Sequence, residues 1–214
     1  MTDNLMAFEK KPFLIILSAP SGGGKTTILR AILQLMNNID YSVSYTTRRP
    51  RGTEVNHVDY HFVSREEFER RIAAGDFLEH ARFSDNLYGT SISFIQSRLD
   101  QGRHVIMDIE ILGANQISNT QIPYVKIFIL PPSLDVLKER LIKRHTDSLT
   151  EIEKRLNIAR DEIKHIPEYD YLVINDDLEL AVQSVRQIIL SEENRTCRYH
   201  NPNRDFLIEG DTHD

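Results

Sequence analysis

The stretch FLIILSAPSGGGKTT, residues 13–27, decides the fold class of this 214-residue chain. It opens with a continuous apolar run, which is typical of a strand covered on both faces of a parallel sheet. Three glycines and a lysine come next, and residues 26–36 (TTILRAILQLM) then place apolar side chains at helical spacing. Glycines at the end of a buried strand indicate a place where an anion approaches the backbone closely.

The glycine-rich stretch matches the phosphate-loop pattern Gly-x-x-x-x-Gly-Lys-Ser/Thr except at its first position, which is alanine. Its glycines let successive N–H groups point at one anion, and the helix starting at Lys25 directs its positive dipole end to the same place. We therefore expect a nucleotide-phosphate site in which Lys25 reaches the β- and γ-phosphates and the Thr26 hydroxyl coordinates Mg²⁺. The expected loop residues are Ala19, Pro20, Ser21, Gly22, Gly23, Gly24, Lys25, Thr26 and Thr27.

Further apolar runs at 104–109, 124–130 and 171–175 alternate with helical patterns. This alternation predicts an α/β fold, a P-loop-type parallel sheet core flanked by helices. Two segments interrupt it: one mixes short strand-like pieces with a loop and a short helix, and the other is a helical flap with a polar, basic loop. We expect a core of residues 1–38, 91–138 and 160–193, a small mixed insertion at 39–90, the flap at 139–159, and a mobile or weakly docked C-terminal tail at 194–214.

Composition limits the classes of function. The net charge of −6 argues against a nucleic-acid binder, although it leaves room for a local cationic pocket. Cys197 is the only cysteine, which excludes an intrachain disulfide and fits a reducing compartment. The N-terminus has no apolar signal segment, and no apolar run approaches the ~20 residues of a spanning helix. We expect a cytoplasmic protein that binds neither nucleic acid nor membrane, and its oligomeric state stays open.

Several motifs, in order along the chain, resemble those of the guanylate kinase family. They are SVSYTTRRPRGTEVNHVDYHFVS (42–64), FLEHARFSDNLYGTS (77–91), MDIEILGANQI (107–117), IFILPPS (127–133) and YDYLVINDD (169–177). The resemblance covers about residues 13–193. It implies transfer of the γ-phosphoryl group of ATP to GMP, giving ADP and GDP, with the insertion binding GMP and the flap acting as a helical lid.

The insertion supplies groups suited to GMP. Arg48 and Arg51 can grip a phosphate dianion bidentately, and by resemblance they are the family's phosphate ligands, together with two tyrosine hydroxyls. Glu79 matches the family carboxylate that accepts both N1–H and N2–H of guanine, a donor pair that adenine lacks. The expected GMP residues are Ser44, Arg48, Arg51, Glu54, Tyr60, Glu79, Tyr88, Thr90, Asp108 and Glu110.

The remaining site residues follow from the core and the flap. Asp108 ends the 104–109 run, where a P-loop protein holds Mg²⁺ or its waters. Arginines on the flap can neutralise charge on the transferring phosphoryl group. By resemblance, Asn175 and Asp176 belong to the adenine-side loop that binds ATP. The expected catalytic residues are Lys25, Arg48, Arg140, Arg144 and Arg155, and the expected metal ligands are Thr26 and Asp108.

Three positions depart from the family pattern: Glu110 replaces an aspartate, Leu112 a glutamine and His145 a glycine. Three other functions are compatible with parts of the sequence. A non-catalytic interaction module of the same fold would typically lose phosphate-loop residues, which this chain retains. A kinase for UMP or TMP would differ in base selectivity. A GTPase switch would need an Asn-Lys-x-Asp stretch, and the sequence contains none.

Overall fold

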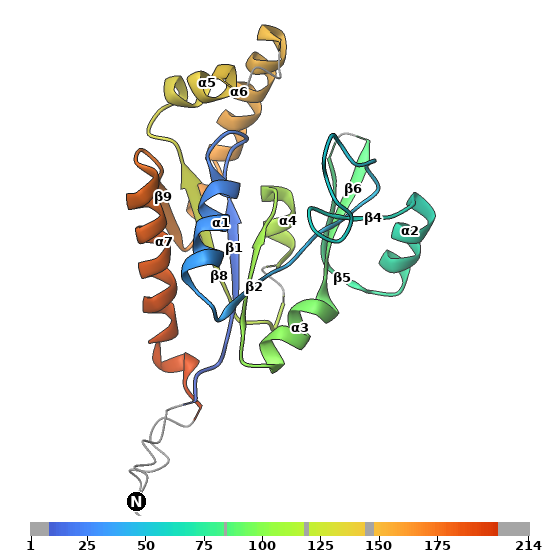
Figure 1. Ribbon diagram of the computed structural model, residues 1–214, viewed down its shortest axis with the longest axis vertical. Helices are drawn as coiled ribbons and strands as arrows, with labels where there is room; N and C mark the ends of the chain where they lie inside the picture. Colours follow the sequence, from blue (N-terminus) through green and yellow to red (C-terminus); the bar gives the residue numbers. More distant parts are fainter. Residues whose placement is uncertain (1–8, 84, 118–119, 144–147, 201–214) are drawn as a thin grey trace, which may run out of the picture.

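The computed structural model describes residues 9–83, 85–117, 120–143 and 148–200, and a five-stranded parallel sheet forms its centre (Figure 1). In sheet order the strands are β2 (Ile39–Tyr41), β7 (His104–Asp108), β1 (Leu14–Ser18), β8 (Tyr124–Leu130) and β9 (Tyr171–Ile174). β1 lies between β7 and β8, and both pairings are parallel. The expected α/β fold class is confirmed.

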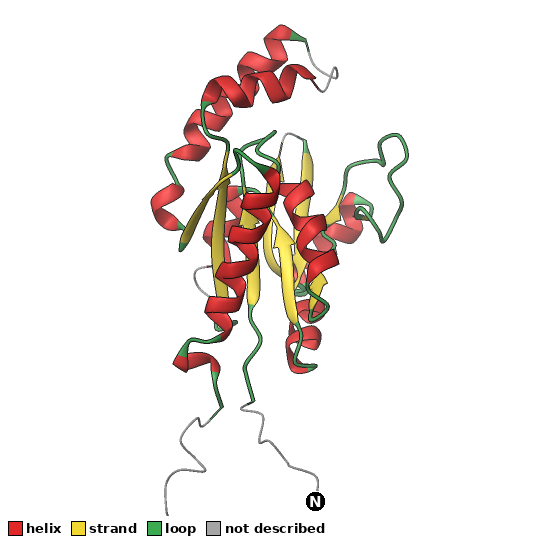
Figure 2. Ribbon diagram, turned by 60° about the vertical axis from the view of Figure 1, so that its left-hand side comes forward, coloured by secondary structure: helices red, strands yellow, loops and turns green. Residues whose placement is uncertain are grey.

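Helices cover both faces of this sheet (Figure 2). Successive side chains of β1 alternate between the faces: Ile15 and Leu17 pack on α1 (Lys25–Leu35) and α7 (Leu178–Glu193), while Leu14 and Ile16 face α3 (Ile92–Asp100) and α4 (Ile111–Gln116). All four side chains are fully buried. A strand buried on both faces reads as a continuous apolar run, which explains the sequence of β1.

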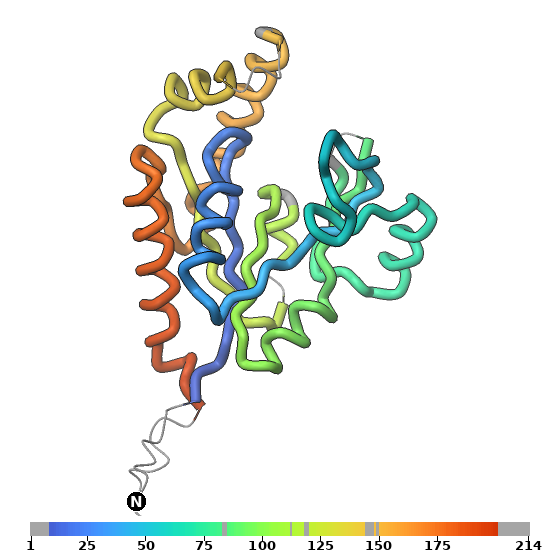
Figure 3. Tube along the Cα trace, in the orientation of Figure 1, coloured from blue at the N-terminus to red at the C-terminus, as the bar shows by residue number. Residues whose placement is uncertain are grey.

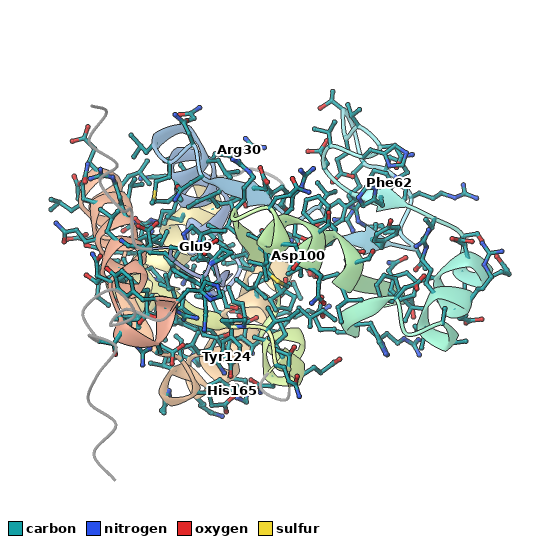
Figure 4. All side chains as sticks on the ribbon, turned by 90° about the horizontal axis from the view of Figure 1, so that it is seen from below. Glu9, Arg30, Phe62, Asp100, Tyr124 and His165 are labelled. Carbon is teal, nitrogen blue, oxygen red and sulfur yellow. The ribbon has the colours of Figure 1, made fainter. Side chains whose placement is uncertain are left out.

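The insertion forms a second, mixed sheet of four strands that projects from the core (Figure 1). In sheet order the strands are β4 (His61–Phe62), β3 (Tyr45–Thr46), β6 (Asn86–Ser91) and β5 (Phe77–Phe83). Beside this sheet lies α2 (Arg65–Ala73), which is capped by the Ser64 hydroxyl. Seen from below, Phe62 lies far from Glu9 and Tyr124 of the core (Figure 4).

The chain enters the insertion after β2 and returns through α3, as the tube shows (Figure 3). The predicted insertion begins at residue 39, but residues 39–41 form β2 and pair with β7 in the larger sheet. Three residues are too short for an apolar run, and Asp40 within them forms an ion pair with Arg103, so the sequence pattern did not reveal this strand.

The predicted flap at 139–159 covers parts of two helices, α5 (Leu134–Lys143) and α6 (Leu149–Ile163), and from here on the flap means this helix pair. The two helices pack on each other through Leu137, Leu141 and Leu156. They lie beyond the phosphate-loop end of the larger sheet (Figure 1). The Ser148 hydroxyl caps α6 by accepting the N–H of Glu151 at 3.3 Å. The described residues also form the short 3₁₀ helices η2 (Ile166–Glu168) and η3 (Thr196–Arg198).

The first part of the predicted tail is docked. Arg198 is 6% exposed, and it bonds the carboxylate of buried Glu192 at 3.2 Å. Arg198 therefore anchors this stretch to the core, although residues 194–197 and 200 are exposed, and residues 201–214 lie outside the described part. No described helix has both the length and the apolar character needed to cross a membrane.

Candidate functional site

The phosphate loop joins β1 to α1 and takes a conformation that glycine alone adopts easily. Gly22 and Gly24 have φ of 96° and 97°, in the left-handed region. The buried Asn175 donates its side-chain N–H to the carbonyl of Gly23 at 2.8 Å, and a Cβ on Gly24 would collide with this amide. Asn175 thus holds the loop from β9, and Gly24 is needed both for its φ and for space.

Lys25, the first residue of α1, meets Asp108 at the carboxyl end of β7. The Lys25 ammonium lies 3.9 Å from Asp108 Oδ2 and donates to the carbonyl of Ile109 at 3.4 Å. The Tyr41 hydroxyl donates to Asp108 Oδ1 at 2.7 Å. Burial, together with the negative charge of Asp108, raises the pKa of Tyr41 well above its usual range, so the phenol stays a donor. The carboxylate is therefore held on one side by a neutral donor and faces a cation on the other.

Tyr41 was not predicted as a site residue. It pairs with Ile106 of β7, two residues before Asp108, and this register brings the phenol to the carboxylate. No sequence motif signals the contact, because it depends on β2 pairing with β7.

Glu79 is an almost fully buried acid at 4% exposure. It lies opposite Thr90 in the β5–β6 ladder, and the Thr90 hydroxyl donates to its Oε1 at 2.6 Å. Burial raises the pKa of Glu79 to about 7, although the Thr90 hydrogen bond acts in the opposite direction. An ionised carboxylate here lacks a cationic partner among the described ion pairs and is suited to accept hydrogen bonds from a ligand.

Arg48 and Glu54 form a bidentate pair in the insertion, with N···O distances of 2.9 and 2.8 Å. The Arg48 guanidinium also stacks over the Tyr60 ring at 5.2 Å, and Glu54 accepts the backbone N–H of Arg51 at 2.7 Å. The pair raises the pKa of Arg48 and lowers the pKa of Glu54. Arg48 is thereby held in a fixed orientation, while Arg51 is exposed on the loop.

A first cleft of about 790 Å³, open solvent included, lies between the insertion and the phosphate loop. Six of the ten predicted GMP residues meet here, together with Lys25, whereas Arg48, Arg51, Glu54 and Thr90 do not line the cleft. Four lining residues, Ala81, Arg82, Ile109 and Gly113, were not predicted. The cleft is lined by Lys25, Ser44, Tyr60, Glu79, Ala81, Arg82, Tyr88, Asp108, Ile109, Glu110 and Gly113.

A second cleft lies on the other side of the phosphate loop, under the flap. Here Arg140 donates to the backbone carbonyl of Asn175 at 2.8 Å, and near it Arg155 lies 3.4 Å from the Ser21 hydroxyl. Lys143 and Leu178 are the lining residues that the sequence did not point to. The cleft is lined by Gly22, Gly24, Thr27, Arg140, Lys143, Asn175, Asp176 and Leu178.

Some predicted positions do not enter either cleft. Thr26 is exposed in the first turn of α1 and is absent from both linings. Arg144 and His145 lie outside the described residues, and so does the side chain of Leu112. Among the described residues no group of three or more histidine, cysteine or acidic side chains could hold a metal by itself.

Comparison with known proteins places this geometry in context. A guanylate kinase family model matches residues 11–192. A guanylate kinase of Clostridioides difficile (strain 630) is 45% identical over 194 residues, covering 91% of this chain and 95% of the relative, and one of Enterococcus faecalis is 46% identical over 191 residues, covering 89% and 94%. The crystal structure of guanylate kinase from Anaplasma phagocytophilum is similar with a TM-score of 0.79 at 32% identity, covering 95% of this chain and all of that one.

Proposed function

Because this chain belongs to the guanylate kinase family, which converts ATP and GMP to ADP and GDP, we propose that its first cleft binds GMP and its second cleft binds ATP. The observation that carries this assignment is the nearly buried carboxylate of Glu79, 4% exposed, in one cleft with Lys25 and Asp108.

Glu79 reads the guanine base in this proposal. Its Oε1 is oriented by the Thr90 hydroxyl, so the carboxylate presents fixed acceptors to N1–H and the N2 amine. Adenine would place a lone pair against the same carboxylate, and an unpaired buried charge costs several kcal/mol. Ser44 and Glu110, which line the cleft, flank the base.

The phosphate of GMP is held by the insertion. Glu54 accepts two hydrogen bonds from the Arg48 guanidinium, with N···O distances of 2.9 and 2.8 Å. These bonds occupy one edge of the planar guanidinium and orient its remaining N–H donors. Tyr60, whose ring Arg48 covers, and Tyr88 line the first cleft and add hydroxyl donors, and Arg51 completes the grip from the exposed loop. Charge-assisted bonds of this kind are about twice as strong as neutral ones.

The ATP phosphates lie on the phosphate loop, between Lys25 and the flap arginines. Arg140 and Arg155 already contact the loop region through Asn175 and Ser21, so a small movement of the flap brings their charges to the transferring group. Arg144, from its place in the sequence, joins them. Asp176, beside Leu178 in the second cleft, lies on the adenine side. Catalysis is positioning plus charge neutralisation, because the GMP oxygen is itself the nucleophile.

Mg²⁺ suits the oxygen donors found at this place. The Asp108 carboxylate and the Thr26 hydroxyl are hard ligands of the kind Mg²⁺ prefers, and Tyr41 already binds one oxygen of Asp108. We assign Thr26 and Asp108, directly or through water, to hold the ion, which would neutralise charge on the ATP phosphates. The Lys25 ammonium lies 3.9 Å from Oδ2 of the same carboxylate.

The insertion and the flap close over both nucleotides in this proposal, because water in the site would hydrolyse ATP. Closure is tested by solution scattering: curves with and without both nucleotides should differ, and superimposable curves would refute it. We place the reaction in the cytoplasm, where ATP and GMP are found.

The assignment of the two clefts is tested by ADP production from ATP and Mg²⁺ with GMP, AMP, UMP or dTMP as separate acceptors. We expect turnover with GMP and at least about 100-fold less with the other three. Comparable turnover with a second base would refute the role of Glu79. Turnover with none, despite nucleotide binding, would favour a non-catalytic interaction module.

A further inference from the structure

We propose that helix α4 determines guanine specificity by positioning Glu79 through two residues, Gly113 and Gln116. Neither residue was predicted for the site, and neither carries a group that would itself react. The inference rests on the proposed role of Glu79 as the guanine acceptor. It concerns what holds that carboxylate in place.

Gly113 provides the space for the carboxylate. It is buried in α4 and lines the first cleft, and a Cβ built on it would collide with Glu79 Oε2. Its φ is outside the left-handed region, so the backbone of α4 would accept alanine, which is favoured over glycine in helices. The helix itself does not require glycine at this position. The absence of a side chain leaves room for the Glu79 carboxylate to pack against α4.

The displaced oxygen would have few places to go. Glu79 Oε1 is bound by Thr90 at 2.6 Å, so a methyl group at residue 113 would press on Oε2 while Oε1 stays tethered. The carboxylate must then rotate into the cleft or break its bond with Thr90. Either movement takes the acceptors away from the positions that match N1–H and N2–H.

Gln116 fixes the backbone next to Glu79. Its side-chain amide donates to the carbonyl of His80 at 2.7 Å and accepts the His80 N–H at 3.2 Å. β5 is an edge strand whose other side pairs with β6, so the glutamine amide takes the place of a neighbouring strand at the free edge. These two bonds join the insertion, which carries Glu79, to the core helix that also carries Gly113.

α4 thus holds β5, the strand that carries Glu79, through the hydrogen bonds of Gln116 to the β5 backbone. Three residues earlier on α4, Gly113 leaves the space that the Glu79 carboxylate occupies. We expect both residues to affect GMP and leave ATP unaffected, since ATP lies on the other side of the phosphate loop. A general structural role would instead lower stability and affect both substrates alike.

The test compares Gly113→Ala and Gln116→Ala with Asn115→Ala, a control on the same helix. We expect Gly113→Ala to raise KM for GMP at least about tenfold and Gln116→Ala about three- to tenfold, with KM for ATP changed less than about twofold. The melting temperature of Gly113→Ala should fall little, because the better helix propensity of alanine offsets part of the strain at Glu79. Asn115→Ala should change neither KM.

A double-mutant cycle separates the inference from the function it rests on. In a Glu79→Ala background, adding Gly113→Ala should change KM for GMP less than about twofold, because the methyl group then meets no carboxylate. An equal, tenfold effect in both backgrounds would overturn the inference, and so would unchanged KM values in both single variants of α4. If Glu79→Ala alone leaves KM for GMP unchanged, the role of Glu79 itself is refuted.

Discussion

Glu79→Gln should make the protein more stable while it destroys guanine recognition. Burial raises the pKa of this carboxyl from its ordinary 4.5 to about 7. For an acid, a raised folded-state pKa means that stability is lost as pH rises from about 4.5 to about 7, because the unfolded chain ionises more easily. At about 1.4 kcal/mol for each pKa unit, ionised Glu79 destabilises the free protein by about 3 kcal/mol above pH 7.

The amide of the variant does not ionise, so this cost disappears. Its carbonyl oxygen can still accept the Thr90 hydroxyl, which keeps the side chain in place. Its NH₂ group then faces the guanine donors, and two hydrogen bonds to a charged acceptor are lost. At about 1.5–3 kcal/mol each, their loss lowers kcat/KM for GMP by about 10²–10⁴-fold.

Urea unfolding at pH 5 and pH 8 measures the stability of both proteins without ligand. The stabilisation of the variant over the wild type should be about 2–3 kcal/mol greater at pH 8 than at pH 5. A stabilisation that is equal at both pH values would refute the argument from burial. If the Glu79→Gln variant has the same kcat/KM for GMP as the wild type, the argument from hydrogen bonding is refuted.

Three other contacts give predictions of their own. Tyr41→Phe removes the donor to Asp108 and should lower kcat about three- to tenfold with a higher Mg²⁺ requirement in a titration; an unchanged titration would contradict this. Asn175→Ala releases the phosphate loop and should raise KM for ATP about tenfold while lowering the free energy of unfolding by about 1–3 kcal/mol; unchanged unfolding would count against it. Glu54→Gln loosens Arg48 and should raise KM for GMP about tenfold in steady-state kinetics, a result that equal KM values would exclude.

Much of the core could be predicted from the sequence, because a strand buried on both faces must be apolar throughout. The run at residues 13–18 and the glycines after it indicated the central strand and the phosphate loop, and both lie where expected. β2 could not be predicted in this way. It is three residues long, is an edge strand and contains Asp40, whose charge is compensated by Arg103 from elsewhere in the chain.

The candidate site shows the same limit. Lys25, Glu79 and Asp108 belong to motifs with a recognisable chemistry, and they meet in one cleft. Tyr41 lies outside every such motif, and Gly113 lies within the 107–117 motif but has no side chain that would mark it as a site residue. Their parts in the site follow from strand register and helix placement, which depend on contacts between distant segments.

The central claim is that Glu79 recognises both donors of the guanine edge, and a comparison of GMP, IMP and AMP as acceptors tests it most directly. IMP keeps N1–H and lacks the N2 amine, so it isolates one of the two hydrogen bonds. We predict kcat/KM to fall about tenfold or more from GMP to IMP, and again from IMP to AMP. Equal values for GMP and IMP would contradict recognition of the amine, and equal values for all three would contradict any role of Glu79 in reading the base.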